Sequence, residues 1–131
     1  MAEIREMTIR MFLAEDDVHW RDHIQDRLAQ QSELELIATK PTQAAATAWL
    51  DEHADEWDLA IVDLFLDEGT GAGIVRHCRR HGITKPIVVF TNYEVPGVLN
   101  SVREFGASAV FSKLGDGLES LIDYCVTIEI E

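Results

Sequence analysis

Five polar residues with chemistry suited to metal or phosphate stand at the ends of apolar runs. Asp63 directly follows the apolar run 59–62. A carboxylate at the end of a buried strand is costly to desolvate unless a cation or hydrogen bonds compensate. The other four occupy equivalent positions: Glu15 and Asp16 after residues 9–14, Thr91 at the end of 86–91, and Lys113 after 109–112.

If these runs are parallel strands, the five side chains meet at one edge of a sheet, where open α/β sheets bind ligands. Three carboxylates close together repel one another, so the set calls for a counter-charge. Mg²⁺ fits, because it prefers oxygen ligands and commonly binds one or two carboxylates together with a phosphate. With the ammonium of Lys113 and the hydroxyl of Thr91, such a site can hold a phosphoryl group on Asp63 as an acyl phosphate.

Strand-like and helix-like segments alternate along the whole chain, which predicts five βα units. Such units imply a parallel sheet with helices on both faces, and we expect the strand order 2-1-3-4-5, one of two common solutions. A loop is expected at 68–73, where three glycines fall within five residues. The expected strands are 9–14, 34–38, 59–63, 86–91 and 109–112; the expected helices are 17–31 with Asp17 as cap, 42–53 with Thr42 as cap, 74–81, 96–105 and 117–128.

The length of 131 residues predicts one domain, residues 1–131 with a core at about 8–128, and no separate output domain. No apolar stretch reaches the roughly 20 residues that span a bilayer, and residues 1–10 lack a signal-peptide core. We therefore expect a cytoplasmic protein without membrane insertion.

The net charge of −13, from 24 acidic and 11 basic residues, argues against direct binding to nucleic acid. One basic cluster interrupts the acidic chain, at Arg76, Arg79, Arg80 and Lys85. We interpret it as the solvated face and end of a helix rather than as a binding patch.

Four motifs in order give the chain a specific likeness, although each alone is weak. They are Phe-Leu-Ala-Glu-Asp-Asp at 12–17, Asp-Leu-Ala-Ile-Val-Asp-Leu at 58–64, Pro-Ile-Val-Val-Phe-Thr at 86–91 and Gly-Ala-Ser-Ala-Val-Phe-Ser-Lys at 106–113. Over essentially its whole length the sequence resembles the response-regulator receiver domains of bacterial-type two-component signalling, which have the flavodoxin-like fold.

The resemblance implies a phosphoacceptor, a metal site and a set of partners. It implies that Asp63 accepts a phosphoryl group from a histidine kinase or a histidine phosphotransfer protein. Glu15, Asp16, Asp63 and the backbone carbonyl of Phe65 would bind Mg²⁺. Thr91 and Lys113 would contact the phosphoryl group and relay its presence.

Four positions depart from the family pattern. Asp67 stands where the family often has proline, and Asn92 where it usually has a small residue. Leu114 replaces a proline that often follows a cis peptide; before leucine a cis bond costs about 3 kcal/mol, so we expect trans. Val110 stands at the position of a switch residue that is usually Tyr or Phe, and an aromatic switch would require the next residue, Phe111, to substitute for it.

The function predicted is therefore a stand-alone, non-enzymatic receiver that signals by phosphorylation of Asp63, through protein contacts or onward phosphorelay. Its protein target is unknown, and the expected signalling face is the fourth helix, fifth strand and fifth helix, around Asn100, Arg103, Phe111 and Glu119. Two alternatives are a receiver-like binding module that is never phosphorylated and a Mg²⁺-dependent phosphohydrolase. The second is disfavoured because the Asp-x-Asp start of the haloacid-dehalogenase type is missing after Asp63, and no substrate-covering insert is present.

Overall fold

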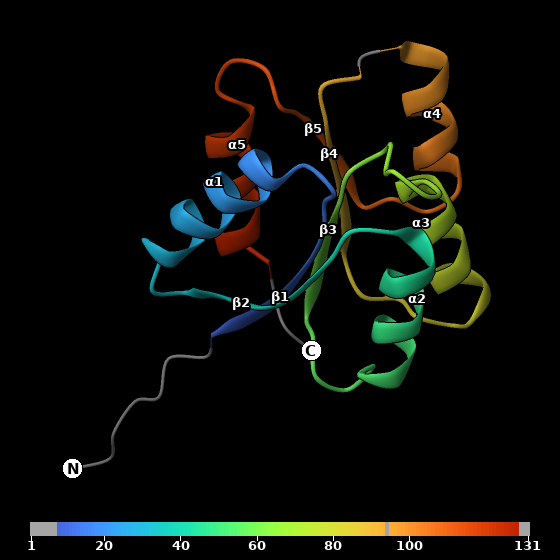
Figure 1. The fold of residues 1–131 in the computed structure, drawn as a ribbon, viewed down its shortest axis with the longest axis horizontal. Coiled ribbons are helices and arrows are strands. Elements are labelled where there is room, and N and C mark those ends of the chain that lie inside the picture. Colours follow the sequence, from blue (N-terminus) through green and yellow to red (C-terminus); the bar gives the residue numbers. More distant parts are fainter. Residues whose placement is uncertain (1–7, 94, 129–131) are drawn as a thin grey trace.

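The computed structural model describes residues 8–93 and 95–128, in which strands and helices alternate strictly (Figure 1). The strands are β1 (Ile9–Ala14), β2 (Leu34–Lys40), β3 (Leu59–Val62), β4 (Ile87–Thr91) and β5 (Ala109–Ser112). The helices are α1 (Val18–Ala29), α2 (Gln43–Glu52), α3 (Gly71–Arg80), α4 (Pro96–Glu104) and α5 (Gly117–Val126). Every predicted element is present, and β2 extends two residues beyond its expected end.

The five strands form one parallel sheet in the order β2-β1-β3-β4-β5, as predicted. Helices α1 and α5 cover one face of it, and α2, α3 and α4 cover the other (Figure 1). The register aligns the carboxyl ends of the strands, since Ala14 pairs with Val62 and Thr91 pairs with Ser112. The residues that follow these strands therefore share one edge of the sheet.

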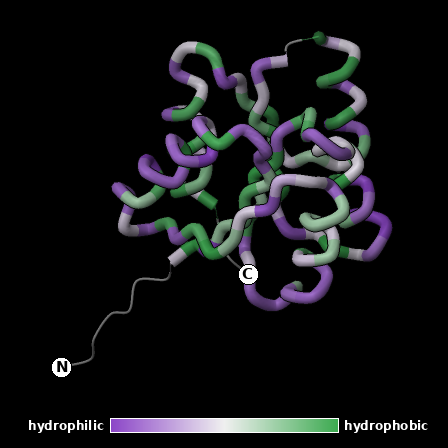
Figure 2. Tube along the Cα trace, viewed as in Figure 1, coloured by the Kyte–Doolittle hydropathy of each residue, from purple (hydrophilic) through white to green (hydrophobic). Residues whose placement is uncertain are grey.

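Each face of the sheet has its own apolar core. Strand residues such as Phe12 and Val89 pack under α2, α3 and α4, whereas their neighbours Leu13 and Phe90 pack under α1 and α5. This alternation follows from the two-residue period of a strand. In Figure 2 hydrophobic residues follow the central strands, and hydrophilic ones line the outer turns of the helices.

Helices α1 and α2 each begin at a residue whose side chain caps the first turn. The carboxylate of Asp17 accepts hydrogen bonds from the backbone N–H groups of His19 and Trp20. The hydroxyl of Thr42 accepts one from the N–H of Ala45. Both predicted caps are thus confirmed, and each satisfies donors that the first helical turn would leave unpaired.

Helix α3 begins at Gly71, three residues earlier than predicted, because the glycines of this segment serve packing instead of breaking the helix. Thr70 caps it by accepting a hydrogen bond from the N–H of Gly73 at 2.9 Å. A Cβ at Gly71 would lie 2.2 Å from the carbonyl oxygen of Asp63, so only glycine lets the helix start this close to the end of β3. The expected loop therefore shortens to the residues before Thr70.

The basic cluster is only half exposed, which corrects the prediction of a solvated helix face. The guanidinium of Arg79 donates hydrogen bonds to the carbonyl oxygens of Gly106, Ile83 and Lys85. The ammonium of Lys85 donates to the carbonyls of Ala54 and Trp57. These two side chains connect the segments that precede β3, β4 and β5 at the amino edge of the sheet. Of the four basic residues in the cluster, Arg76 and Arg80 lie exposed.

Replacing Gly71 with alanine should therefore destabilise the protein by about 1–3 kcal/mol, the usual cost of overpacking. The matched control is Gly97→Ala in α4, where a Cβ meets nothing within 4 Å. That change should be neutral or stabilise by up to about 1 kcal/mol, because alanine favours helix over glycine. Urea unfolding curves measure both; equal effects of the two substitutions would contradict the close approach at Gly71.

Candidate functional site

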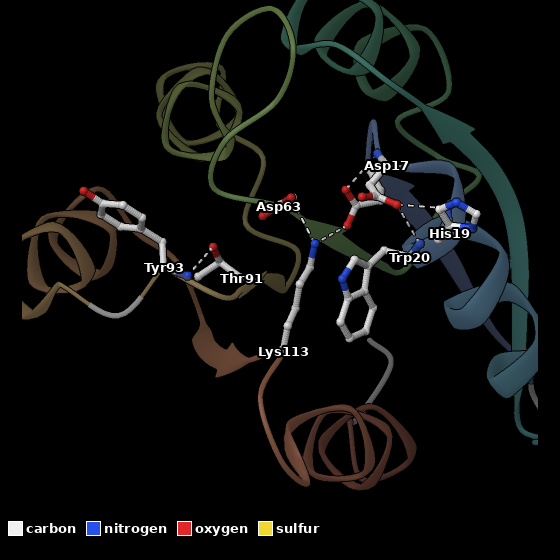
Figure 3. Close-up of polar contacts among 8 residues, drawn as sticks. Asp17, His19, Trp20, Asp63, Thr91, Tyr93 and Lys113 are labelled. Atoms are coloured by element: carbon white, nitrogen blue, oxygen red, sulfur yellow. Dashed lines mark hydrogen bonds and ion pairs between the residues drawn. The ribbon is translucent and has the colours of Figure 1, made fainter.

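Lys113 joins two of the predicted site carboxylates at the carboxyl edge of the sheet. Its Nζ lies 2.5 Å from Oε1 of Glu15 and 3.1 Å from Oδ2 of Asp63 (Figure 3). The side chains are 3%, 1% and 12% exposed for Lys113, Glu15 and Asp63. The three charges come from the loops after β5, β1 and β3, so the parallel register brings them together.

Glu15, Asp16 and Asp63 each offer a carboxylate oxygen, and these oxygens lie within 4.8 Å of one another. A set of three carboxylates with one ammonium carries excess negative charge in a partly buried place. An all-oxygen donor set of this kind fits a hard divalent cation such as Mg²⁺. The residues present therefore fit the cofactor that the sequence predicts.

Burial changes the acid strength of Glu15. Desolvation raises the pKa of Glu15 to about 7, helped by the negative charge of Asp63 and opposed by the hydrogen bond from Lys113. Its second oxygen, Oε2, accepts a hydrogen bond from the backbone N–H of Asp17 at 3.2 Å. Glu15 is thus held in place by neighbours on both sides, and a bound cation would favour its ionised form.

Asp67 extends the acidic cluster on its solvent side. The hydrogen bond between the carboxyl groups of Asp67 and Asp16 raises the pKa of Asp67, and the charge of Asp16 adds to this effect. The family often has an uncharged proline at the position of Asp67, so this chain places a further acidic group beside a predicted metal ligand.

Thr91 is buried at the end of β4, and its hydroxyl oxygen accepts a hydrogen bond from the N–H of Tyr93 at 3.1 Å. Figure 3 shows Thr91 on the opposite side of Lys113 from Trp20. The ring of Tyr93 meets that of Phe65 edge to face at 4.7 Å, and both rings are exposed beside the site. The role of the Phe65 carbonyl as a metal ligand stays a prediction.

Sequence reasoning missed Trp20 as a neighbour of the site. Trp20, Ile24 and Leu28 follow one another at four-residue spacing, a pattern that predicts a core face, and Ile24 and Leu28 are buried. Trp20 lies one turn earlier on that face, where its ring reaches Lys113 at 5.0 Å from the ring centroid to Nζ. The available signal was its distance of three residues from the Asp17 cap, which places it next to the end of β1.

Two residues predicted for the signalling face, Phe111 on β5 and Glu119 on α5, make contacts on the α1 side of the sheet. Glu119 forms a bidentate ion pair with Arg27 of α1, at 2.7 and 2.8 Å, so its carboxylate turns towards α1. Phe111 packs under α1 and α5 against Tyr124, whereas Val110 packs on the opposite face of the sheet with α4. Because adjacent strand residues point to opposite faces, Phe111 cannot replace an aromatic residue at position 110.

Two other departures from the family pattern lie exposed. Asn92 sits in the loop after β4, and Leu114, with 59% exposure, follows Lys113. The peptide bond before Leu114 is trans, as predicted. Asn100 and Arg103 lie exposed on α4, where the signalling face was expected.

Comparison with known proteins identifies the family. The model of the response regulator receiver domain matches residues 11–123, so the chain belongs to this family of signalling domains. A curated relative is the virulence transcriptional regulatory protein PhoP of Salmonella choleraesuis, 34% identical over 86 residues. That match covers 66% of this chain and 37% of PhoP, so the chain spans only part of this relative.

Solved receiver structures share the fold at low sequence identity. The receiver domain of the putative response regulator NarL from Mycobacterium tuberculosis has a TM-score of 0.82 at 15% identity, covering 93% of this chain and 99% of that one. The response regulator domain of Thermotoga maritima CheB has a TM-score of 0.81 at 12% identity, covering 93% and 98%. Within the described residues, no helix has the length and apolar character needed to cross a membrane.

The raised pKa of Glu15 predicts a pH dependence of the metal-free protein. A carboxyl whose pKa is higher when folded stabilises the fold fully below its unfolded pKa and loses this contribution as pH rises through about 7. In EDTA, the wild type should lose about 1–3 kcal/mol relative to Glu15→Gln between pH 4.5 and pH 8. Urea unfolding at both values measures this; parallel pH profiles of the two proteins would refute the shift.

The Asp16–Asp67 contact predicts that Asp67 strengthens cation binding. Asp67→Asn should weaken Mg²⁺ binding about two- to five-fold, the scale of one exposed charge at a few ångströms. Glu68→Gln is the matched control, because Glu68 contributes only a smaller charge effect on Asp67. Calorimetric titration at low salt measures both affinities, and equal losses in the two variants would show that only overall charge matters.

Proposed function

We propose that Asp63 is the phosphoacceptor of this receiver domain and takes its phosphoryl group from a histidine kinase or a histidine phosphotransfer protein. The observation that carries the proposal is the buried ammonium of Lys113 held between Glu15 and Asp63. Asp63 is the more exposed of the two carboxylates, with 12% exposure against 1% for Glu15, so a donor can reach it.

Glu15, Asp16 and Asp63 would hold Mg²⁺, with the Phe65 carbonyl as a further ligand in this proposal. The close approach of the three carboxylates supports it. When bound, the cation neutralises charge on the phosphoryl oxygens during transfer.

The transfer itself is a displacement at phosphorus. An oxygen of the Asp63 carboxylate forms a new bond to phosphorus while the bond from phosphorus to the donor imidazole nitrogen breaks. The imidazole leaves with the electron pair and takes up a proton, and Asp63 becomes an acyl phosphate. Lys113 already touches Asp63 and can donate a hydrogen bond to a phosphoryl oxygen.

Thr91 supplies a second donor in this proposal. Its oxygen already accepts a hydrogen bond from the Tyr93 N–H, and a hydroxyl has one donor in addition to its acceptor positions. The hydroxyl hydrogen of Thr91 is therefore available for a phosphoryl oxygen. Lys113 and Thr91 come from adjacent strands, joined by the hydrogen bond from the Lys113 N–H to the Thr91 carbonyl at 2.9 Å.

The phosphorylated domain would signal in the cytoplasm through contacts with a protein target or by passing the phosphoryl group on. The exposed residues Asn100 and Arg103 of α4 support a contact surface on that side. An aromatic switch is absent from position 110, and Phe111 faces the other side of the sheet. This observation favours, as a second candidate, a receiver-like module that binds its partner without phosphorylation.

Incubation with acetyl phosphate and Mg²⁺ should add one phosphoryl group to the wild-type protein, detected by intact-mass spectrometry. Asp63→Asn should abolish the adduct, because the amide is not a nucleophile for phosphorus, and EDTA should suppress it by removing the metal. Asp67→Asn is the matched control at saturating Mg²⁺, since it removes a nearby carboxylate and should leave the adduct in place. No adduct in the wild type would reject the proposal and leave the binding module, whereas an adduct that persists in Asp63→Asn would reject Asp63 as the phosphoacceptor.

A further inference from the structure

The rings of Trp20 and Phe90 form an aromatic wall, which the ammonium of Lys113 contacts on the side facing α1. Its Nζ lies 5.0 Å from the centroid of the Trp20 ring and 6.0 Å from that of Phe90. The two rings meet edge to face, with centroids 5.6 Å apart and planes at 88°. Figure 3 shows the Trp20 ring beside the Lys113 side chain, below the carboxylates.

The wall is itself held in place. Phe90 is 1% exposed in the core under α1 and α5. The backbone N–H of Trp20 donates to Oδ1 of Asp17 at 3.1 Å, and the N–H of Asp17 donates to Oε2 of Glu15 at 3.2 Å. Two hydrogen bonds at the start of α1 thus link Trp20 through Asp17 to Glu15. The other carboxylate oxygen of Glu15 contacts Lys113.

We propose that Trp20 is a positioning residue for phosphoryl transfer, holding the Lys113 ammonium towards Asp63. The inference rests on the proposed function of Asp63 and adds a role for a residue outside the metal and phosphoryl groups. A lysine ammonium is attracted to the face of an indole ring by the ring quadrupole. The attraction needs no hydrogen-bond donor, so all three N–H groups of Lys113 stay available for oxygen atoms.

Lys113 needs a contact other than Glu15 to hold its ammonium near Asp63. The shortest contact of the Lys113 ammonium is the 2.5 Å ion pair with Glu15. Glu15 is also a proposed cation ligand, so metal binding competes for this partner. A lysine stem has four carbons and many rotamers, and without Glu15 it would gain freedom. Trp20 keeps the ammonium on the Asp63 side when Glu15 is engaged elsewhere.

A purely structural Trp20 would affect stability alone, so the test uses rates. Phosphorylation by acetyl phosphate with Mg²⁺ is followed by intact mass over a range of donor concentrations. Trp20→Leu should lower the maximal rate about five-fold, the scale of one cation–π contact, and leave the half-saturating donor concentration unchanged. Trp20→Phe keeps an aromatic face and should stay within about two-fold of wild type.

Trp49→Leu is the matched control. Trp49 stacks on Phe12 at 5.0 Å on the opposite face of the sheet, so the same change removes a comparable aromatic contact away from Lys113. It should lower the melting temperature and leave the maximal rate at its wild-type value. A Trp20→Leu variant that is folded and phosphorylated at the wild-type rate would overturn the proposal, as would an equal loss of rate in Trp49→Leu.

A fluorescence measurement tests the contact independently of phosphorylation. Indole emission depends on nearby charge, so Lys113→Met should shift the emission of the metal-free protein. The shift should vanish when the same change is made in the Trp20→Phe background, which still contains Trp49 and Trp57. No shift with Lys113→Met would overturn the role of Trp20. Failure of wild-type phosphorylation would instead reject the function of Asp63, so the two failures are distinct.

Discussion

The ion pair of Lys113 with Glu15 and Asp63 is the interaction on which the rest of the site depends. A buried ammonium is unfavourable unless partners of good geometry compensate for lost hydration. Here two carboxylates, a tryptophan face and the end of a strand surround it. With Asp16 nearby, the site keeps an excess of negative charge. An oxygen-donor set with such an excess fits a hard divalent cation. Asp16 extends the effect to the exposed Asp67, whose pKa it raises through a hydrogen bond and through its charge.

The fold provides this geometry through register and close packing. Pairing of Ala14 with Val62 and of Thr91 with Ser112 brings residues from four strand ends to one edge. The tight start of α3 at Gly71 adds to this, because its N–H donates to the carbonyl of Leu64, one residue after Asp63. The loop that carries the proposed phosphoacceptor is therefore anchored at both ends, to β1 through the Asp63 N–H and to α3 through Gly71.

The predicted site residues match the motifs of the receiver family, but position 110 departs from the family pattern. Val110 places no aromatic ring on the face of the sheet covered by α4, and Phe111 packs in the core under α1 and α5. The Arg27–Glu119 ion pair links α1 to α5 across the surface of that second core. Trp20 belongs to the same side of the sheet as these residues. The contacts of Lys113 therefore extend to α1 through Trp20 as well as along β5.

The sequence by itself determined the class of fold, the order of its elements and the identity of the converging residues. Alternating apolar runs and polar strand ends carry that information locally, because periodicity and capping depend on near neighbours. Only the tertiary structure decided which face each side chain meets. Gly71 was misjudged because its need for a bare Cα comes from the distant Asp63 carbonyl. Arg79 and Lys85 were assigned to a solvated helix face because partners such as Gly106 and Trp57 are 27 and 28 residues away along the chain. Trp20 packs against the core under α1 and α5, but its contact with Lys113 does not follow from the helical spacing, because that spacing fixes a direction and not the partner. Those contacts depend on how helices pack on the sheet, which no local pattern specifies.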